Sequence, residues 1–551
     1  MLSKKMKNGK YYYYLEERAR INGKSTRLWQ KYVGTEDKMK EMKISMSPQK
    51  LDYQTMDFGA SAALYQIAKK IDFINIIDNQ VDKKRHQNLS LGEYMLIATI
   101  NRCLSPVSKN KLSSWFKNDF LSTIFTLDPE ILNSQTYWNH FQYLTKEKIA
   151  KIETELIRKA LAVFNLDLST LLFDPTNFFT FIDSSESGEL PQFGHSKENR
   201  NNLRIINVSL VNTLQMGVPV FHQTYEGNIQ DAKHFKDAIK SIIERFQSLN
   251  QTIQNIVLIF DKGNHSVEAF KEIDESNLQF IASLRNSTQK DLLEINFDQF
   301  KMIKLPSNKK EVGFFRTHRT VYNKDRLVYV LYDSQKQKRT IAKFELKLEN
   351  KLQQIKNLLE KLNKKKWRSQ ENVEKKLKTI IGKKPFSEII SFTISGLFAE
   401  LKVSIQQNEA IKQTYFNSLG RSIIFTNLTF WDDSKIIQAF RDKYIIEDAF
   451  RNLKDPSMIA IRPMFHWSDV SIRAHVFSCV LSLLLLSLLR KELDQSSIDL
   501  TYSEILDELN ELKLTMIYIG SNLVPFYKLN RHSSLSDKMF KILGFKSILP
   551  Q

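Results

Sequence analysis

Cysteine is scarce in this chain, and its scarcity excludes several classes of protein. The two cysteines, Cys103 and Cys479, lie far apart in the sequence and match no zinc-binding spacing. A disulfide framework is therefore excluded, and we expect a reducing compartment, the cytoplasm. The sequence also contains no Gly-x4-Gly-Lys-Ser/Thr loop, which argues against a kinase or an ATPase, and it contains no internal repeat.

Long apolar runs are also missing. Residues 1–10 are rich in lysine and contain no apolar segment of the kind that signal peptides carry, so we expect no secretory signal. The longest apolar run, 476–489, has 14 residues, which is short of the roughly 20 that a membrane-spanning helix needs. It therefore predicts a buried core helix.

Basic residues, in contrast, are in excess. Among 551 residues, 81 Lys and Arg stand against 61 Asp and Glu, which gives a formal net charge of +20. This surplus favours a polyanionic partner such as nucleic acid over an unrelated basic enzyme, because lysine and arginine near phosphates release counterions. The length predicts three or four structural units, and the 42% of hydrophobic residues predict a folded protein.

The apolar pattern changes along the chain. Residues 10–34 predict a β-hairpin around an Asn-Gly turn, and residues 56–165 predict helices that either bind DNA or form a plain packing domain. Short runs rich in Val, Ile and Phe then predict the strands of a buried sheet, at 171–174, 204–214, 218–225, 255–261 and 280–284. A helix is expected at 231–249. Three strands, a helix and a fourth strand are the opening order of an RNase H-like fold.

Residues 290–430 interrupt this pattern. They combine strand-like pieces with apolar residues spaced four and three apart over 348–362, which predict a short helical hairpin. The stretch 364–384 is dense in lysine, and it forms either a solvated helix face or a contact to a phosphate backbone.

Two aspartates stand where metal-dependent catalysis needs them. Asp174 ends the apolar run 171–174, and Asp261 ends the run 255–261. A charged side chain at the end of a buried strand is costly without a partner, and two carboxylates at one sheet edge repel each other unless cations bridge them. Such oxygen ligands bind hard divalent ions. For either aspartate alone, a turn or a helix cap is the alternative.

Glu447 is the third acidic residue of interest. As a helix, residues 439–454 separate an apolar face from a polar stripe of Lys443, Glu447, Arg451 and Lys454. Such a stripe can hold a metal ion at its carboxylate and phosphates at its cations. Solvent-exposed ion pairs along the helix are the alternative.

These segments resemble bacterial insertion-sequence transposases of the DDE type, in the insertion-sequence-four superfamily. The family signature is a Tyr, two residues, an Arg, three residues, a Glu, six residues and a Lys. Here that register holds Phe440, Lys443, Glu447 and Lys454, so the spacings are kept while Phe replaces Tyr and Lys replaces Arg. Residues 173–179, 194–231 and 260–266 are similar to the family's other blocks, and the resemblance spans roughly residues 10–490.

The resemblance implies a DNA transposase that cleaves the ends of its insertion sequence and joins them to target DNA. Asp174, Asp261 and Glu447 are expected to hold two Mg²⁺ ions, with Mn²⁺ able to substitute. Lys443, Arg451 and Lys454 are expected to contact DNA. The implied partners are double-stranded DNA, as terminal inverted repeats and as target, and a second copy of the chain in a homodimeric synaptic complex. The implied location is the bacterial cytoplasm, at the nucleoid.

The fold implied is α/β, with an RNase H-like core of a mixed sheet flanked by helices and a β-rich insertion domain. The expected segments are an N-terminal hairpin region, a helical domain, the first part of the core, the insertion, the second part of the core and a tail, at 1–50, 51–165, 166–289, 290–430, 431–500 and 501–551.

Several alternatives stay open. Asp183 is a rival for Asp174 as the first aspartate, although its Ser- and Glu-rich surroundings are typical of a loop. Asn264 and His265 either approach the scissile phosphate or cap a helix. The rival functions are a nuclease of the same fold that does not join DNA, and a catalytically decayed derivative that only binds it.

Overall fold

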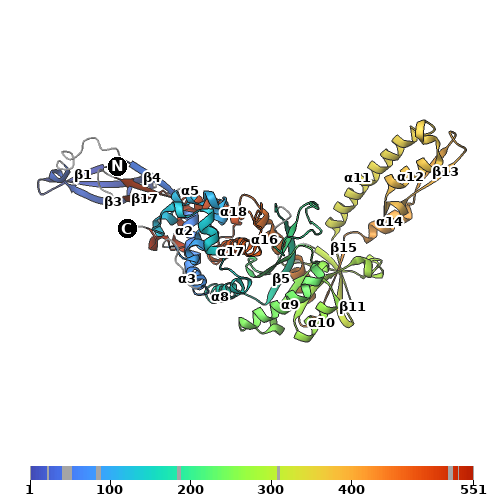
Figure 1. Ribbon diagram of the computed structural model, residues 1–551, viewed down its shortest axis with the longest axis horizontal. Coiled ribbons are helices and arrows are strands. Elements are labelled where there is room, and N and C mark those ends of the chain that lie inside the picture. Colours follow the sequence, from blue (N-terminus) through green and yellow to red (C-terminus); the bar gives the residue numbers. More distant parts are fainter. Residues whose placement is uncertain are drawn as a thin grey trace. The chain divides into compact units, whose positions relative to one another are not determined.

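The computed structural model describes residues 2–21, 24–39, 52–81, 89–182, 188–306, 311–518, 525–530 and 533–549. Figure 1 shows the chain coloured along its sequence. The chain divides into two compact units, and neither is continuous in sequence. The first comprises residues 1–66, 108–134 and 493–551, and the second comprises 67–107 and 135–492. The units therefore cut across the expected segments, because elements far apart in the chain pack together.

Two antiparallel three-stranded sheets belong to the first unit. Their strands are β1 (Leu2–Lys7), β2 (Lys10–Ile21), β3 (Lys24–Thr35), β4 (Asp52–Asp57), β16 (Lys513–Tyr518) and β17 (Phe526–Leu529). The expected hairpin is confirmed as β2 and β3, and its turn residues 22 and 23 lie outside the described residues. Helices of this unit are α2 (Gly59–Lys70), which begins here, and α5 (Leu112–Lys117), α6 (Leu121–Ile124), α18 (Tyr502–Asn510) and α19 (Ser534–Ile542).

The C-terminal segment is not a tail. Strand β16 lies in the middle of its sheet and pairs with β4, so that Lys513 is the register partner of Asp57. The rings of Phe58, Phe120 and Phe545 meet edge to face in the core of this unit. The two ends of the chain therefore complete one hydrophobic core, which a local pattern does not reveal.

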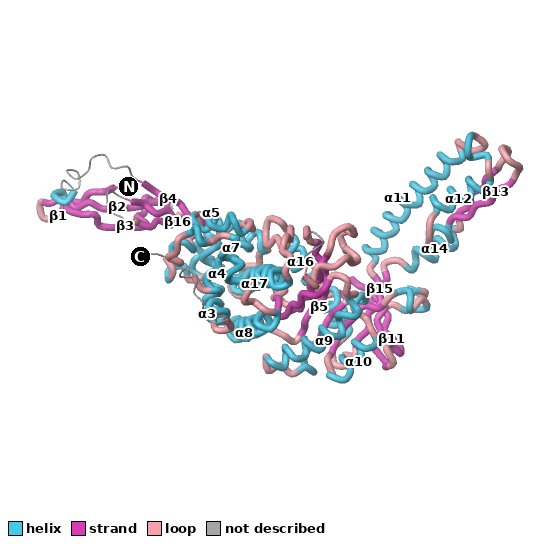
Figure 2. The backbone as a smooth tube through the Cα atoms, in the orientation of Figure 1, coloured by secondary structure: helices cyan, strands magenta, loops and turns pink. Residues whose placement is uncertain are grey.

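A nine-stranded mixed sheet is the centre of the second unit (Figure 2). Its strands, in spatial order, are β10 (Lys301–Lys304), β11 (Glu311–Val321), β12 (Lys324–Tyr332), β15 (Arg421–Thr426), β9 (Gln279–Leu284), β8 (Val257–Phe260), β5 (Thr170–Phe179), β6 (Ile205–Thr213) and β7 (Pro219–Glu226). Strand β8 runs parallel to both β5 and β9, and the other neighbours are antiparallel. The expected strands from residue 171 to residue 284 are thus confirmed.

The helices of the second unit before the arm and after it are α3 (Phe73–Asp78), α4 (Leu91–Leu104), α7 (Ser134–Phe141), α8 (Lys146–Phe164), α9 (Asp231–Ser248), α10 (Val267–Ser276), α15 (Asp433–Arg441), α16 (Tyr444–Lys454) and α17 (Asp469–Asp494). Some of them pack on the two faces of the sheet. Phe235 of α9 packs against Phe173 and Phe260 on one face. On the other face, His222 of β7 contacts Glu153 of α8. The mixed sheet flanked by helices is the α/β architecture expected.

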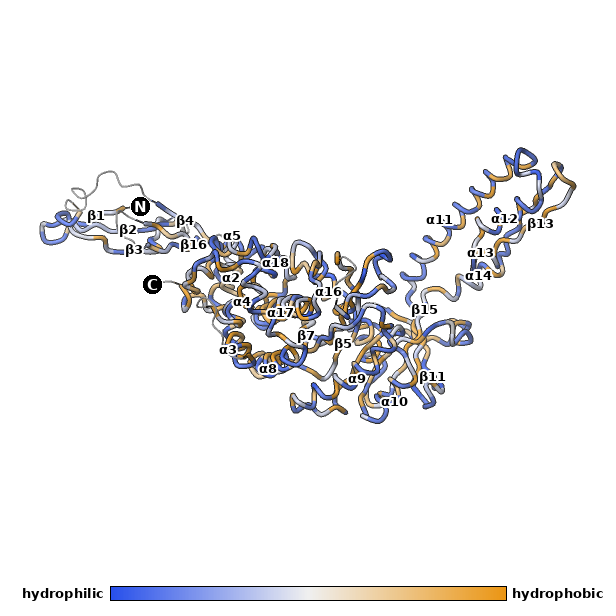
Figure 3. The backbone as a smooth tube through the Cα atoms, viewed as in Figure 1, coloured by the Kyte–Doolittle hydropathy of each residue, from blue (hydrophilic) through white to orange (hydrophobic). Residues whose placement is uncertain are grey.

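Helix α17 confirms the expected core helix around residues 476–489. It is long and apolar enough to cross a membrane, but 94% of its most apolar window is buried inside the protein. Its apolar run can be followed by hydropathy in Figure 3. The burial makes it a core helix of the second unit.

The insertion differs from the expected β-rich domain. Strands β10, β11, β12 and β15 join the central sheet, and the remainder is mainly helical. That remainder consists of α11 (Ser334–Leu359), α12 (Gln370–Ile381), α13 (Phe386–Ile389), β13 (Ile390–Ser395), β14 (Lys402–Gln407) and α14 (Glu409–Ser418). We call residues 334–420 the arm; α11 leads it away from the sheet in Figure 1. The arm has its own hydrophobic core, and the apolar spacing over 348–362 builds part of it.

Candidate active site

Asp174 and Asp261 lie side by side in register. Thr170 pairs with Val257 across the parallel strands β5 and β8, and Leu172 pairs with Ile259, so partners differ by 87 in residue number. The two aspartates also differ by 87, which extends the same register beyond the end of β8 at Phe260. Since side chains alternate along a strand, both carboxylates point to one face, opposite Phe173 and Phe260.

Asp174 does not end its strand, as the sequence suggested. Strand β5 continues to Phe179 because β6 pairs with it along its whole length. What ends near Asp174 is the parallel neighbour β8. Because β8 stops while β5 continues, the sheet is open at the end of β8, where the two carboxylates meet. We call this place the carboxylate edge.

Both oxygens of Asp261 have partners. The Ser283 hydroxyl donates to Oδ1 at 2.8 Å, and the Lys443 ammonium donates to Oδ2 at 2.6 Å. Burial raises the pKa of Asp261, but Lys443 and Ser283 outweigh it, so the pKa lies below its usual value. This carboxylate is therefore ionised at neutral pH.

Asp174 has the opposite electrostatic character. Burial raises the pKa of Asp174 to about 7, the Lys197 ammonium opposes the rise, and the Asp261 carboxylate adds to it. The two carboxylates lie close enough for the charge of Asp261 to raise the pKa of Asp174. Paired oxygen ligands of this kind favour a divalent ion.

Helix α16 lies against β5 and carries the third candidate. Its apolar residues Ile446, Ala449, Phe450 and Leu453 are buried, as the sequence predicted. Burying one such large side chain contributes about 1.5–3 kcal/mol. At one end Lys443 reaches Asp261, and at the other Lys454 donates to Thr176 at 3.1 Å. Two cations of the polar stripe thus reach the sheet near the paired aspartates, one from each end of the helix.

Glu447 is exposed in the first turn of α16, one turn beyond Lys443. Among the described residues, no group of three His, Cys, Asp or Glu side chains is arranged to hold a metal ion. The structure therefore brings Asp174 and Asp261 together and leaves Glu447 on the helix that faces them. Two neighbouring carboxylates, one of them buried with a raised pKa, offer oxygen donors of the kind that a divalent ion takes.

Arg451 does not join the site. It pairs with Asp448 at 2.7 Å, and its side chain is 73% exposed. Phe440, which stands in the tyrosine position of the family signature, is buried, and the Lys443 ammonium lies 5.3 Å from its ring centre. The phenyl ring thus lies next to the Lys443 ammonium.

Two residues of the site were not singled out from the sequence, Lys197 and Asp231. The Lys197 ammonium donates to the carbonyl of Pro175 at 2.6 Å and lies 3.4 Å from Asp231. The Asp231 carboxylate also accepts from the hydroxyl of Tyr225 at 3.2 Å. Their signal was present, because both belong to the segment 194–231 that carries the resemblance.

Three residues, Asp183, Asn264 and His265, had alternative roles in the sequence analysis. Asp183 lies outside the described residues. Ser266, and neither Asn264 nor His265, caps helix α10, since its hydroxyl accepts from the amide of Ala269. The ring of His265 instead packs among aromatic side chains, and burial lowers its pKa to about 4.

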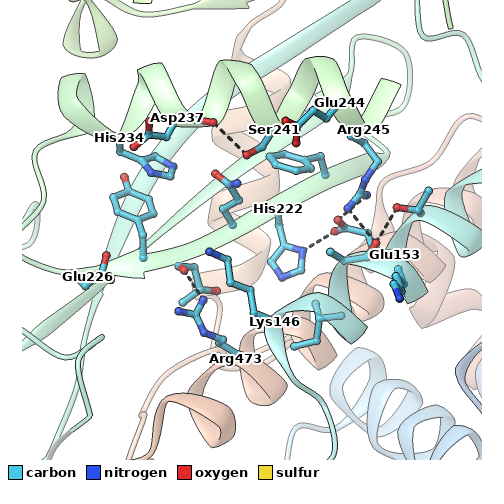
Figure 4. A pocket seen from close by; sticks show the side chains of 18 of the residues that line it. Lys146, Glu153, His222, Glu226, His234, Asp237, Ser241, Glu244, Arg245 and Arg473 are labelled. Atoms are coloured by element: carbon cyan, nitrogen blue, oxygen red, sulfur yellow. Dashed lines mark hydrogen bonds and ion pairs between the residues drawn. The ribbon is translucent and has the colours of Figure 1, made fainter. Parts of the chain in front are cut away.

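A separate cavity of about 560 Å³ lies beside the edge strand β7, between α8 and α9 (Figure 4). The buried Glu153 carboxylate at its wall contacts His222 at 2.5 Å and Arg245 at 2.7 Å. Burial raises the pKa of Glu153, but these two neighbours hold it below its usual value. None of the six predicted site residues lines this cavity.

Comparisons with known proteins add little. No family model and no curated protein matches the chain. Among solved structures, the cryo-EM structure of a piggyBac transposase synaptic complex with hairpin DNA is similar at 8% identity and a TM-score of 0.36, over 82% of this chain and 78% of that one. A likeness at this score does not establish a shared fold or activity.

Proposed function

We propose that this chain is a DNA transposase of the DDE type with an RNase H-like core. The observation that carries the proposal is the shared register of Asp174 and Asp261, with Lys443 of the Glu447 helix 2.6 Å from Asp261. The strand order supports the core, since three antiparallel strands and a helix precede a strand parallel to the first.

Asp174, Asp261 and Glu447 are the proposed ligands of two Mg²⁺ ions, for which Mn²⁺ can substitute. When bound, such ions activate the attacking oxygen and stabilise the leaving one. Lys443 and Lys454, at the two ends of the carboxylate edge, hold backbone phosphates of double-stranded DNA. Arg451 contacts DNA from the exposed side of α16. Two copies of the chain bring the two element ends together.

A cleavage and joining assay tests the proposal. The purified chain, incubated with Mg²⁺ and a duplex that carries the inverted repeats flanking its gene, is expected to cut at the repeat end and join it to a supercoiled plasmid. Cutting without joining supports a nuclease of the same fold instead. Binding without cutting supports a decayed derivative.

The arm gives a prediction about DNA affinity. It carries 19 Lys and Arg against 8 Asp and Glu, so its surplus is more than half of the chain's net charge of +20. Tyr332 and Arg421, at its two ends, are register partners, so residues 334–419 can be replaced by Asn-Gly. We expect at least about a tenfold loss of duplex affinity and a shallower salt dependence, because each lost phosphate contact removes about 0.9 from the slope. Fluorescence anisotropy across a salt series measures both, and an unchanged slope contradicts the prediction.

The raised pKa of Asp174 gives a prediction about pH. A metal ion must displace a proton from this carboxylate below pH 7, so Mn²⁺ affinity is expected to fall about tenfold per pH unit there. The stability of the metal-free protein has the opposite pH dependence. The pKa of Asp174 is higher in the folded than in the unfolded protein, so protonation of Asp174 raises the free energy of unfolding as the pH falls through 7. Calorimetric titration with Mn²⁺ at pH 6, 7 and 8 measures the first effect. Thermal denaturation of the metal-free protein over the same pH range measures the second effect, with Asp174→Asn as the control because it removes the titrating group.

A further inference from the structure

Lys443 occupies the position that a bound cation needs. Its ammonium lies 2.6 Å from Oδ2 of Asp261, while Ser283 holds Oδ1. The ring of Phe440 lies beneath the ammonium at 5.3 Å, and the lysine side chain is 27% exposed. The ammonium is therefore held on the carboxylate edge, yet it remains open to solvent on one side.

A divalent ion on Oδ2 of Asp261 competes with the ammonium of Lys443, because two cations a few ångströms apart repel each other in a partly buried site. Oδ1 of the same carboxylate already accepts from Ser283. A metal ion that binds both Asp174 and Asp261 is therefore expected to drive Lys443 away from Asp261. The flexible four-carbon stem of lysine permits that movement without moving the helix.

We propose that Lys443 is an exchangeable counter-ion, which neutralises Asp261 in the metal-free protein and is released toward a DNA phosphate when divalent ions bind. This inference rests on the proposed function and adds a linkage to it. The lysine that metal displaces becomes available to DNA, so each ligand strengthens the binding of the other. By thermodynamic reciprocity the two strengthening factors are equal.

Lys454 provides a matched control on the same helix. Its ammonium contacts Thr176 at 3.1 Å and Glu198 at 3.5 Å, and neither contact is to the paired aspartates. Lys443 and Lys454 are thus lysines of one helix that differ in whether they hold Asp261. The side chain of Lys443 also makes no capping hydrogen bond to α16, so its loss does not uncap the helix.

The first measurement is metal affinity in the absence of DNA. We expect Lys443→Met to bind Mn²⁺ about tenfold more tightly than the wild type, because removal of a contacting charge shifts such equilibria by a unit or more. Lys454→Met is expected to leave Mn²⁺ affinity unchanged. A substitution that merely damages the fold weakens metal binding. A gain in Mn²⁺ affinity therefore distinguishes the release of Lys443 from structural damage. Lys443→Gln serves as a second uncharged variant, and Lys443→Arg, which keeps the charge, is expected to restore the wild-type affinity.

The second measurement is the linkage itself. Affinity for a mixed-sequence duplex is compared with and without Ca²⁺, which has the same charge and oxygen preference. We expect Ca²⁺ to strengthen DNA binding less in Lys443→Met than in the wild type or Lys454→Met. Unchanged or weaker Mn²⁺ affinity in Lys443→Met, or an equal Ca²⁺ effect in all three proteins, overturns the exchange. Failure of the wild type to bind Mn²⁺ at all overturns the proposed function instead.

Discussion

Asp261→Asn is expected to slow cleavage of DNA ends on the order of 10³-fold or more while duplex affinity is retained. Asparagine keeps the shape of the side chain and can still accept from Ser283, but it loses the charge that binds a divalent ion. Metal ions contribute several kcal/mol of transition-state stabilisation, and about 1.4 kcal/mol is a factor of ten in rate. Asp174→Asn is expected to have an effect of the same size, because its carboxylate shares the register of Asp261.

Single-turnover cleavage of an end-labelled duplex measures the rate, and anisotropy under the same conditions measures binding. Ser283→Ala is the matched control, since it removes a hydrogen bond to Asp261 and leaves both carboxylates in place. We expect it to lower the rate by only about tenfold, the scale of one hydrogen bond to a charged group. Wild-type cleavage by Asp261→Asn would remove that residue from the active site.

Much of the central sheet was predictable from local pattern. Residues rich in Val, Ile and Phe appeared in short runs, and each run became a strand of the nine-stranded sheet. Two-sided burial of strands such as β6 explains why their apolar runs are continuous. The amphipathic pattern likewise identified α16 with the correct buried face, and it predicted a helix where α9 lies.

Register and long-range pairing were not predictable. The sequence shows that Asp174 and Asp261 are 87 residues apart, but only the pairing of Thr170 with Val257 makes that number meaningful. Strand β16 pairs with β4 across more than 450 residues of chain, and nothing local marks either strand as the partner of the other. Pairing of this kind depends on tertiary contacts. The preference of a residue for strands reflects how it packs and how deeply it is buried, and it does not identify the strand with which it pairs.

The partners of the charged side chains were also not predictable from the sequence. The polar stripe on α16 grouped Lys443, Arg451 and Lys454 as equals. In the structure Lys443 holds Asp261, Lys454 holds Thr176, and Arg451 pairs with Asp448 on its own helix. Helical spacing gives the direction of a side chain, whereas its partner depends on the element that packs opposite.

The identity of the third carboxylate ligand of the metal ions leads to a second prediction with a large expected effect on the cleavage rate. There are two candidates: Asp231, whose charge raises the pKa of Asp174, and Glu447, which lies on the helix that follows Lys443. Asp231 is already engaged, because it lies 3.4 Å from Lys197 and accepts from the hydroxyl of Tyr225. Glu447 is exposed on the helix whose Lys443 reaches Asp261. An exposed carboxylate costs less to bring to a metal ion than one that must first give up its partners.

We therefore expect Glu447→Gln to slow cleavage on the order of 10³-fold, as Asp261→Asn does, because the second ion loses a charged ligand. Asp231→Asn is expected to slow it by only about tenfold, through the loosened Lys197. The same single-turnover assay compares the two variants, and thermal denaturation checks that both are folded. The reverse ranking, with Asp231→Asn the more damaging, would make Asp231 the third ligand. It would also leave α16 to supply only cations, because the sheet and the start of α9 would then provide every carboxylate of the site.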